Sequence, residues 1–338
     1  MKEFQNHSLL QHTTFGIDAK ASRYIEYYTE DELQGLLLDL RNTPFLHIGG
    51  GSNLLFTQDY EGTILHSGIK GISVEENGDE VLLRAANGEV WDDVVAYAVS
   101  NGWSGMENLS LIPGEVGASA VQNIGAYGVE AKDLITKVET LEVATGNKRV
   151  FTNEECQYAY RHSIFKQELK GQYIVLAVTY RLSKTFTPKL DYGNIRSELE
   201  RQNIDLNTLT PAHIRQVIID IRNAKLPDPK NLGNAGSFFM NPVISKELHM
   251  LLQNDLALEI PFYEVDECRV KVPAGWLIEH CGWKGCKMGN VGVYEKQALI
   301  LVNHGGASGN EVVQISDAIC KDVKEKFGIS IHPEVNFI

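Results

Sequence analysis

The sequence predicts a multidomain protein in which α-helices are mixed with β-strands and β-hairpins. Three observations predict this organisation. The chain has 338 residues, more than one average hydrophobic core accommodates, so two or three domains are expected. Capping sequences typical of helix N-termini precede apolar residues at helical spacing. Short apolar runs flank turn residues such as Asn77-Gly78, which is typical of hairpins.

The composition is that of an ordinary globular protein, with 43% hydrophobic and 22% charged residues. No apolar run approaches the ~20 residues of a membrane span, and the N-terminus lacks a hydrophobic signal region, so we expect a cytoplasmic protein that does not enter membranes. The net charge of −13 disfavours binding to nucleic acid. Cys281 and Cys286 lack a second ligand pair, so we expect buried thiols and no metal site.

In the first half of the chain, the sequence patterns predict alternating helices and strands. Thr29–Glu32 has the pattern of a capping box, and leucines at helical spacing follow it up to Leu40. A second capping pattern stands at 152–155, and a helix is also expected at 90–100. Strands are expected at 45–48, 63–66, 72–76, 80–86, 134–144, 148–151 and 172–182.

The second half predicts two further helices and an anchored tail. Pro211 begins a helix whose apolar residues recur at helical spacing and which ends at Lys225, before Pro227. Ser308 caps a last long helix, and a strand is expected at 329–331. Because the final residues are apolar, we expect the C-terminus to be held in a sheet.

The stretch Gly49-Gly50-Gly51-Ser52-Asn53 follows an apolar strand and is interpreted as a pyrophosphate cradle. Consecutive glycines let the backbone approach a ligand, and exposed N–H groups in such turns bind anions. A Walker loop is excluded because no lysine follows, and a dinucleotide fingerprint is excluded because Leu54 replaces its third glycine. The alternative interpretation is an ordinary glycine-rich connection.

Two other stretches carry candidate functional residues. Residues 107–128 are small and nearly uncharged, which suits close packing on a flat ligand such as a flavin, with Ser119 and Asn123 as hydrogen-bond donors. Tight packing against a sheet is the competing interpretation. Ser237 lies between glycines and two aromatic residues, but the pattern lacks the last glycine of a hydrolase nucleophile elbow.

Several stretches together resemble the UDP-N-acetylenolpyruvoylglucosamine reductases, FAD enzymes of bacterial peptidoglycan synthesis. The matches keep their order over nearly the whole chain: Gly49 to Asn53, Ile112-Pro113-Gly114, Gln122 to Gly128, Tyr160 to Ser163, Lys225 to Pro229, Gly236 to Phe239 with Asn241-Pro242, Ala274 to Ile278, and His332 to Val335. A segment at 188–193 with Tyr192 resembles the extra loop of the type I branch.

The resemblance implies an α+β fold, with an FAD-binding fold of the vanillyl-alcohol-oxidase (PCMH) type in two subdomains and an α+β substrate-binding domain. The expected bounds are 1–67, joined by the C-terminal strand 328–338, for the first subdomain, 68–210 for the second, and 211–327 for the substrate domain. A monomer is expected.

It also implies a reaction and its participants. NADPH reduces bound FAD, and hydride then passes from flavin N5 to the methylene carbon of an enolpyruvyl ether on a UDP-sugar nucleotide. Ser237 matches the proton donor, while Arg161 and Glu334 match the pair that holds the carboxylate. The residues matched to FAD are Gly49, Gly50, Gly51, Ser52, Asn53, Pro113, Gly114, Ser119, Asn123, Gly125, Ala126 and Arg222. Those matched to the substrate are Tyr127, Tyr192, Lys225, Asn241, Lys271 and Gln297.

Two departures and two alternatives accompany the resemblance. Glu115 stands where a less charged residue is more usual, and His162 where an acidic one often follows the arginine. One alternative is a flavoprotein oxidase of the same fold acting on small alcohols or hydroxy acids, which would leave Lys225, Asn241 and Ser237 idle. The other is a flavin-free sugar-nucleotide-binding protein.

Overall fold

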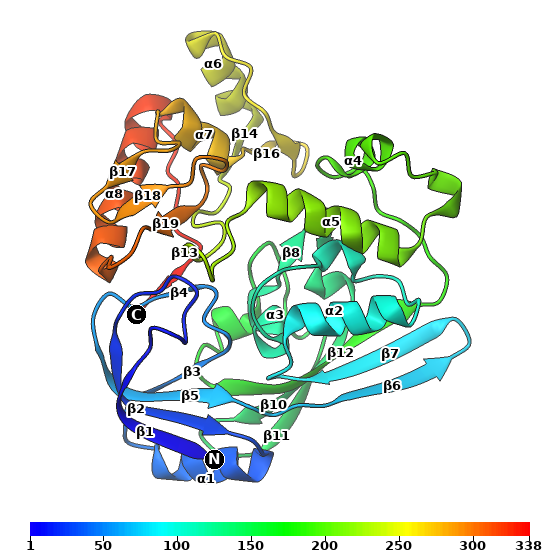
Figure 1. The fold of residues 1–338 in the computed structure, drawn as a ribbon, viewed down its shortest axis with the longest axis vertical. Helices are drawn as coiled ribbons and strands as arrows, with labels where there is room; N and C mark the ends of the chain where they lie inside the picture. Colours follow the sequence, from blue (N-terminus) through cyan, green and yellow to red (C-terminus); the bar gives the residue numbers. More distant parts are fainter. The chain divides into compact units, whose positions relative to one another are not determined.

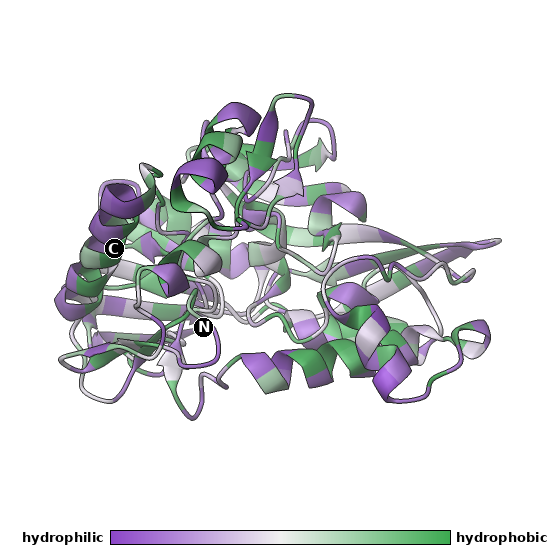
Figure 2. Cartoon of the chain, turned by 90° about the horizontal axis from the view of Figure 1, so that it is seen from above, coloured by the Kyte–Doolittle hydropathy of each residue, from purple (hydrophilic) through white to green (hydrophobic).

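The computed structural model describes all 338 residues, which form two compact units. Unit 1 comprises Met1–His7, Ala21–Gly50 and Glu61–Ala224, and unit 2 comprises Ser8–Lys20, Gly51–Tyr60 and Lys225–Ile338. Hydrophilic residues are interspersed along the helices (Figure 2), and none of these helices has the length and apolar character needed to cross a membrane. The division into three domains at 67 and 210 stays a prediction.

The first sheet of unit 1 has the strand order β1-β2-β5-β3, with helix α1 packed against it (Figure 1). Thr29 caps α1 by accepting from the Glu32 N–H, as predicted. The Glu32 carboxylate accepts from the Tyr28 N–H at 2.7 Å, so the second bond of the predicted capping box is made one residue earlier. The bounds are β1 Lys2–Ser8, β2 Lys20–Tyr27, α1 Glu30–Asp39, β3 Phe45–Ile48 and β5 Tyr60–Ser67.

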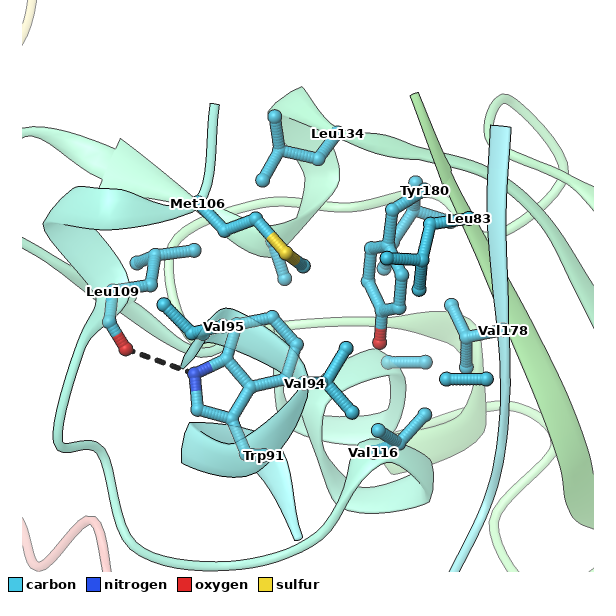
Figure 3. Packing of buried hydrophobic residues seen from close by; sticks show 14 of the residues in the cluster. Leu83, Trp91, Val94, Val95, Met106, Leu109, Val116, Leu134, Val178 and Tyr180 are labelled. Atoms are coloured by element: carbon cyan, nitrogen blue, oxygen red, sulfur yellow. Dashed lines mark hydrogen bonds between the residues drawn. The ribbon is translucent and has the colours of Figure 1, made fainter. Parts of the chain in front are cut away.

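The second sheet of unit 1 is antiparallel, with the order β11-β10-β12-β7-β6, and contains both predicted hairpins. Trp91 of α2 fills the core beside it, edge-on to Tyr180 at 5.5 Å, and donates from Nε1 to the Leu109 carbonyl at 2.9 Å (Figure 3). The bounds are β6 Ile72–Asn77, β7 Glu80–Ala86, α2 Trp91–Ser100, α3 Val116–Gln122, β8 Gly125–Ala126, β9 Val129–Glu130, β10 Ile135–Glu142, β11 Lys148–Thr152, β12 Tyr173–Ser183, α4 Ile195–Arg201 and α5 Pro211–Lys225.

Unit 2 contains the sheet β13-β19-β18-β17, the smaller sheet β14-β16-β15 and three helices. The predicted capping box of α8 is complete, because Ser308 and Glu311 each accept from the other's backbone N–H. The apolar tail is held as expected, since β20 pairs in parallel with β4. The bounds are β4 Leu54–Leu55, β13 Gly233–Asn234, β14 Val243–Ser245, α6 Lys246–Leu256, β15 Tyr263–Glu264, β16 Arg269–Lys271, α7 Ala274–His280, β17 Lys287–Met288, β18 Val291–Val293, β19 Leu301–Asn303, α8 Gly309–Phe327 and β20 Asn336–Phe337.

The structure differs from the sequence patterns in three places. The capping pattern at 152–155 forms both of its hydrogen bonds, yet a turn follows, and Gln157 and Arg161 take positive φ angles of 49° and 54° that no α-helix contains. Residues 116–122, for which no helix or strand was predicted, form α3. The strand expected at 329–331 is absent, and the tail pairs instead through Pro333 and β20.

Acid is expected to destabilise the protein partly through His47 of β3. The Tyr27 hydroxyl lies 2.7 Å from His47 Nε2, and burial, followed by the charge of His66, lowers the pKa of His47 to about 3. The unfolded chain takes up this proton near the ordinary pKa of about 6.5, whereas the folded chain does not. The free energy of unfolding should therefore fall as the pH drops from about 6.5 towards 3. Denaturant titrations should show a shallower fall for His47→Gln and an unchanged fall for the exposed control His213→Gln; equal slopes in all three would contradict the assignment.

Candidate cofactor and substrate site

The two glycine-rich stretches predicted to act together do lie together in unit 1. Gly49 and Gly50 follow β3 and pack on the segment that leads into α3. A Cβ on Gly50 would lie 3.4 Å from Gly114 Cα, and one on Gly49 would lie 3.3 Å from a carboxylate oxygen of Glu115. Two backbones approach closely here because side chains are missing, as a cradle for a ligand requires.

The rest of the glycine turn belongs to unit 2 and is fixed by the N- and C-terminal segments. Gly51 has a φ of +64°, and its backbone lies against the carbonyl of His12. The Asn53 amide donates to the Glu334 carbonyl at 3.3 Å, and the Asn53 carbonyl accepts from the Asn336 N–H at 3.1 Å. The turn is therefore tied to the segment that carries Glu334. Contact of Ser52 and Asn53 with a cofactor remains a prediction.

Ser119 and Asn123 are buried, and their side chains bond within the protein. The Ser119 hydroxyl donates to the Val116 carbonyl and lies 2.7 Å from the Tyr180 hydroxyl. The Asn123 amide donates to Glu130 and to the Ala159 carbonyl, and its oxygen accepts from the Lys132 N–H. These bonds stabilise α3 and the turn after it, and a direct contact of either residue with a cofactor remains a prediction.

Arg161 is held beside the turn that contains Gly125 and Tyr127. Its Nη2 donates to the Gly125 carbonyl at 3.1 Å and its Nη1 to the Asn123 carbonyl at 3.4 Å. The guanidinium also lies over the Tyr160 ring, 5.6 Å from the centroid. The planar side chain is thus oriented by two backbone carbonyls, and a planar guanidinium suits recognition of a carboxylate.

Arg222, Tyr127 and Tyr192 gather at another edge of the same turn. Burial lowers the pKa of Arg222, although the neighbouring Tyr127 and Asp92 oppose this effect. The Nε atom of Arg222 is shielded from solvent and has no hydrogen-bond partner. Burial raises the pKa of Tyr127, against the effect of Arg222. A Cβ on Gly128 would contact Tyr192 at 3.2 Å. A shielded guanidinium with an unused donor fits an anionic or acceptor-rich ligand, so this part of unit 1 fits a flavin nucleotide.

Unit 2 brings Ser237 and Glu334 together from distant parts of the sequence. Phe239 pairs with Pro333, and the Glu334 N–H donates to the Phe238 carbonyl at 2.8 Å. Phe238 and Phe239 are fully buried, and they anchor a turn in which Gly236 has a φ of +67°. Ser237 is thereby exposed next to Glu334, whose side chain is half-buried.

The other predicted substrate residues of unit 2 are spread over its loops and small sheet. The side-chain amide oxygen of Asn241 accepts from the Ala274 N–H, and that of Gln297 accepts from the Leu299 N–H, so both support local structure. Lys271 of β16 lies over the Tyr263 ring, 5.9 Å from the centroid. Tyr263 was not predictable as a neighbour of Lys271, because only the pairing of β15 with β16 brings the two together. Lys225 is exposed at the end of α5.

Comparison with known families defines the class of this protein and then its family. Residues 21–152 match the family profile described as "FAD binding domain", so the protein is an FAD-binding flavoprotein. Residues 228–338 match "UDP-N-acetylenolpyruvoylglucosamine reductase, C-terminal domain". The chain is 56% identical over 337 residues to the UDP-N-acetylenolpyruvoylglucosamine reductase of Bacteroides fragilis, covering 99% of both chains. The chain belongs to the UDP-N-acetylenolpyruvoylglucosamine reductase family.

Further relatives agree with this assignment and with the fold. The reductase of Porphyromonas gingivalis is 49% identical over 337 residues, which cover 99% of this chain and 98% of that one. The crystal structure of UDP-N-acetylenolpyruvylglucosamine reductase from Thermus caldophilus has a TM-score of 0.66 at 21% identity, covering 99% of this chain and 98% of that one. The expected α+β fold with an FAD-binding portion is confirmed.

Proposed function

We propose that this chain uses NADPH to reduce the enolpyruvyl ether of UDP-N-acetylglucosamine enolpyruvate to UDP-N-acetylmuramate, a step of peptidoglycan precursor synthesis. The family makes it an oxidoreductase with FAD as cofactor and NADPH as co-substrate. The single observation that carries the proposal is the 56% identity to a named reductase along 99% of both chains. We also propose that the protein is a cytoplasmic monomer.

The proposed FAD site consists of the residues of the glycine turn together with Pro113, Gly114, Ser119, Asn123, Gly125, Ala126 and Arg222. The close approach of Gly49 and Gly50 to the 114–115 backbone and the unused Nε donor of Arg222 support it. When bound, FAD supplies the hydride, which it receives from NADPH and transfers to the methylene carbon of the substrate. The chain's own task is to orient the two partners and to stabilise the charge that the transfer creates.

Hydride addition to the methylene carbon places negative charge on the neighbouring carbon and its carboxylate. We assign Arg161 to this carboxylate, because its guanidinium is oriented by two backbone carbonyls and can form a fork with two oxygens. Glu334, protonated or bridged to the carboxylate, is assigned to the same group. Ser237 is assigned as the proton donor. A serine is a very weak acid, but a carbon enolate is a strong base, so an exposed hydroxyl next to Glu334 can complete the reaction.

Lys225→Ala is expected to raise the KM for the sugar nucleotide about tenfold and to leave kcat within about twofold. The exposed ammonium at the end of α5 is proposed to meet the substrate diphosphate, which is bound equally in the ground and transition states. Steady-state kinetics with Lys230→Ala as the matched control will measure this effect. An unchanged KM would move the diphosphate to another part of the protein.

The absorbance spectrum of the purified protein tests the proposal as a whole. We expect a flavin band that bleaches with anaerobic NADPH and returns when the enolpyruvyl sugar nucleotide is added. A band that returns only with oxygen would favour an oxidase of the same fold. A protein without a flavin band, even after FAD is added, would favour a flavin-free sugar-nucleotide-binding protein.

A further inference from the structure

A cluster of Glu26, His66 and Glu115 in unit 1 has no part in the function proposed above. Glu115 Oε1 lies 2.8 Å from His66 Nε2, and Glu26 Oε1 lies 3.7 Å from His66 Nδ1. The side chains are 25%, 19% and 12% exposed, in the order of the sequence. His66 Nδ1 is shielded from solvent and has no hydrogen-bond partner. An imidazole thus stands between two carboxylates in a largely buried place.

The cluster lies directly against the glycine turn. In the parallel pairing of β3 with β5, His66 is the partner of Ile48, the residue before Gly49. The other Glu115 oxygen is the atom that a Cβ on Gly49 would meet at 3.3 Å, and Glu115 Cγ lies 3.8 Å from the corresponding position on Gly50. The Glu115 side chain therefore occupies the space beside the two glycines assigned to the FAD diphosphate, with one carboxylate oxygen on the side of Gly49.

Every charged or titratable group facing His66 can be named. From β2 come Glu26 and Tyr24, whose ring centroid is 6.4 Å from that of His66; burial, with Glu26 and Glu115, raises the pKa of Tyr24. From β3 comes His47, which is neutral, and from the start of α3 comes Glu115. Glu26 has partners of its own, since Lys2 and the Tyr28 hydroxyl bond to its other oxygen. Glu115 has His66.

A bare carboxylate at this position would repel a diphosphate in the turn, because charge interactions in partly buried places are weakly screened. An imidazole N–H that donates to that carboxylate offsets part of the repulsion. The same bond fixes the rotamer of Glu115 against Gly49, so it sets both the charge and the shape of this side of the turn.

We propose that His66 is a positioning residue for the cofactor turn: through its hydrogen bond it holds Glu115 against Gly49 and offsets the charge of that carboxylate beside the FAD diphosphate. The proposal rests on the proposed function, in which the Gly49 turn binds FAD. His66 acts through Glu115 and takes no part in hydride or proton transfer.

The dissociation constant for FAD, measured by flavin fluorescence on the full-length chain, tests the proposal through a double-mutant cycle. His66→Gln should raise Kd about tenfold or more, because it leaves Glu115 charged. Glu115→Gln should not raise Kd, and the double variant should return to the Glu115→Gln value. His213→Gln and Glu75→Gln, both exposed substitutions in unit 1, are the matched controls and should bind FAD as the wild type does.

A second His66 variant keeps the test open if His66→Gln does not fold. His66→Asn should raise Kd as His66→Gln does, and combining it with Glu115→Gln should again return Kd to the Glu115→Gln value. The proposal is overturned if the His66 variants bind FAD normally or if the double variants are not rescued. A wild-type chain that binds no FAD overturns the proposed function as well.

Discussion

Replacing Ser237 by alanine should slow the second half-reaction roughly 10²–10⁴-fold and leave the first unchanged. In the proposed mechanism, reduction of FAD by NADPH needs no proton from Ser237, whereas completion of the lactyl ether does. The substitution should not disturb the fold, because Ser237 is exposed and the turn is anchored by the buried rings of Phe238 and Phe239. Rapid-mixing absorbance can follow the two half-reactions separately in one preparation.

Ser73→Ala, an exposed serine on β6, is the matched control and should keep both rates. If Ser237→Ala transferred its hydride to the sugar nucleotide at the wild-type rate, another group would have to supply the proton. A loss of both half-reactions together would instead indicate a damaged flavin site.

Gly51→Ala should destabilise unit 2 by more than about 4 kcal/mol, an effect large enough to prevent accumulation of folded protein. An alanine Cβ at this position would lie 1.9 Å from the His12 carbonyl oxygen, so the backbone must move. That movement would break the Thr14 N–H to Gly51 carbonyl bond of 3.2 Å. The φ of +64° adds roughly 1–2 kcal/mol for a residue with a Cβ.

Gly78→Ala isolates the backbone contribution, because Gly78 has a φ of +62° but no atom within 4 Å of its Cβ position. This control should lose only about 1–2 kcal/mol in a denaturant titration. Similar losses for the two variants would show that the contact with His12 relaxes at little cost.

The helices show what local sequence can and cannot predict. The capping patterns at Ser308 and Thr152 both form their hydrogen bonds, but only Ser308 begins a helix. The difference lies beyond the cap, because α8 continues with a buried apolar stripe from Val312 to Val323, whereas the chain after Thr152 turns at Gln157. Conversely, α3 consists mostly of small or β-branched residues with low helix propensity, and the burial of Val116 and Ala120 stabilises it.

The candidate site was predictable where a sequence motif reflects a backbone conformation or a close approach that only glycine allows. The glycines at 49–51 and 236 stand where the chain needs close approach or positive φ, so they are visible in the sequence. The partners that these turns meet were not predictable from spacing. His66 reaches Glu115 only through the register of β3 with β5, and Glu334 reaches Ser237 only through pairing at Phe239. Neither pairing leaves a local signature.

The bonds between β4 and the C-terminus also bear on the order in which the polypeptide folds during synthesis. The Thr57 N–H donates to the carbonyl of Ile338, the last residue, and β4 pairs with β20 just before it. Neither unit is a continuous stretch of chain, and unit 2 takes in both early segments and the final residues. The strand that follows the glycine turn therefore stays without its partner until Asn336 and Phe337 have emerged from the ribosome. Nascent protein should expose that strand edge until then, and this is the stage at which chaperones would bind it.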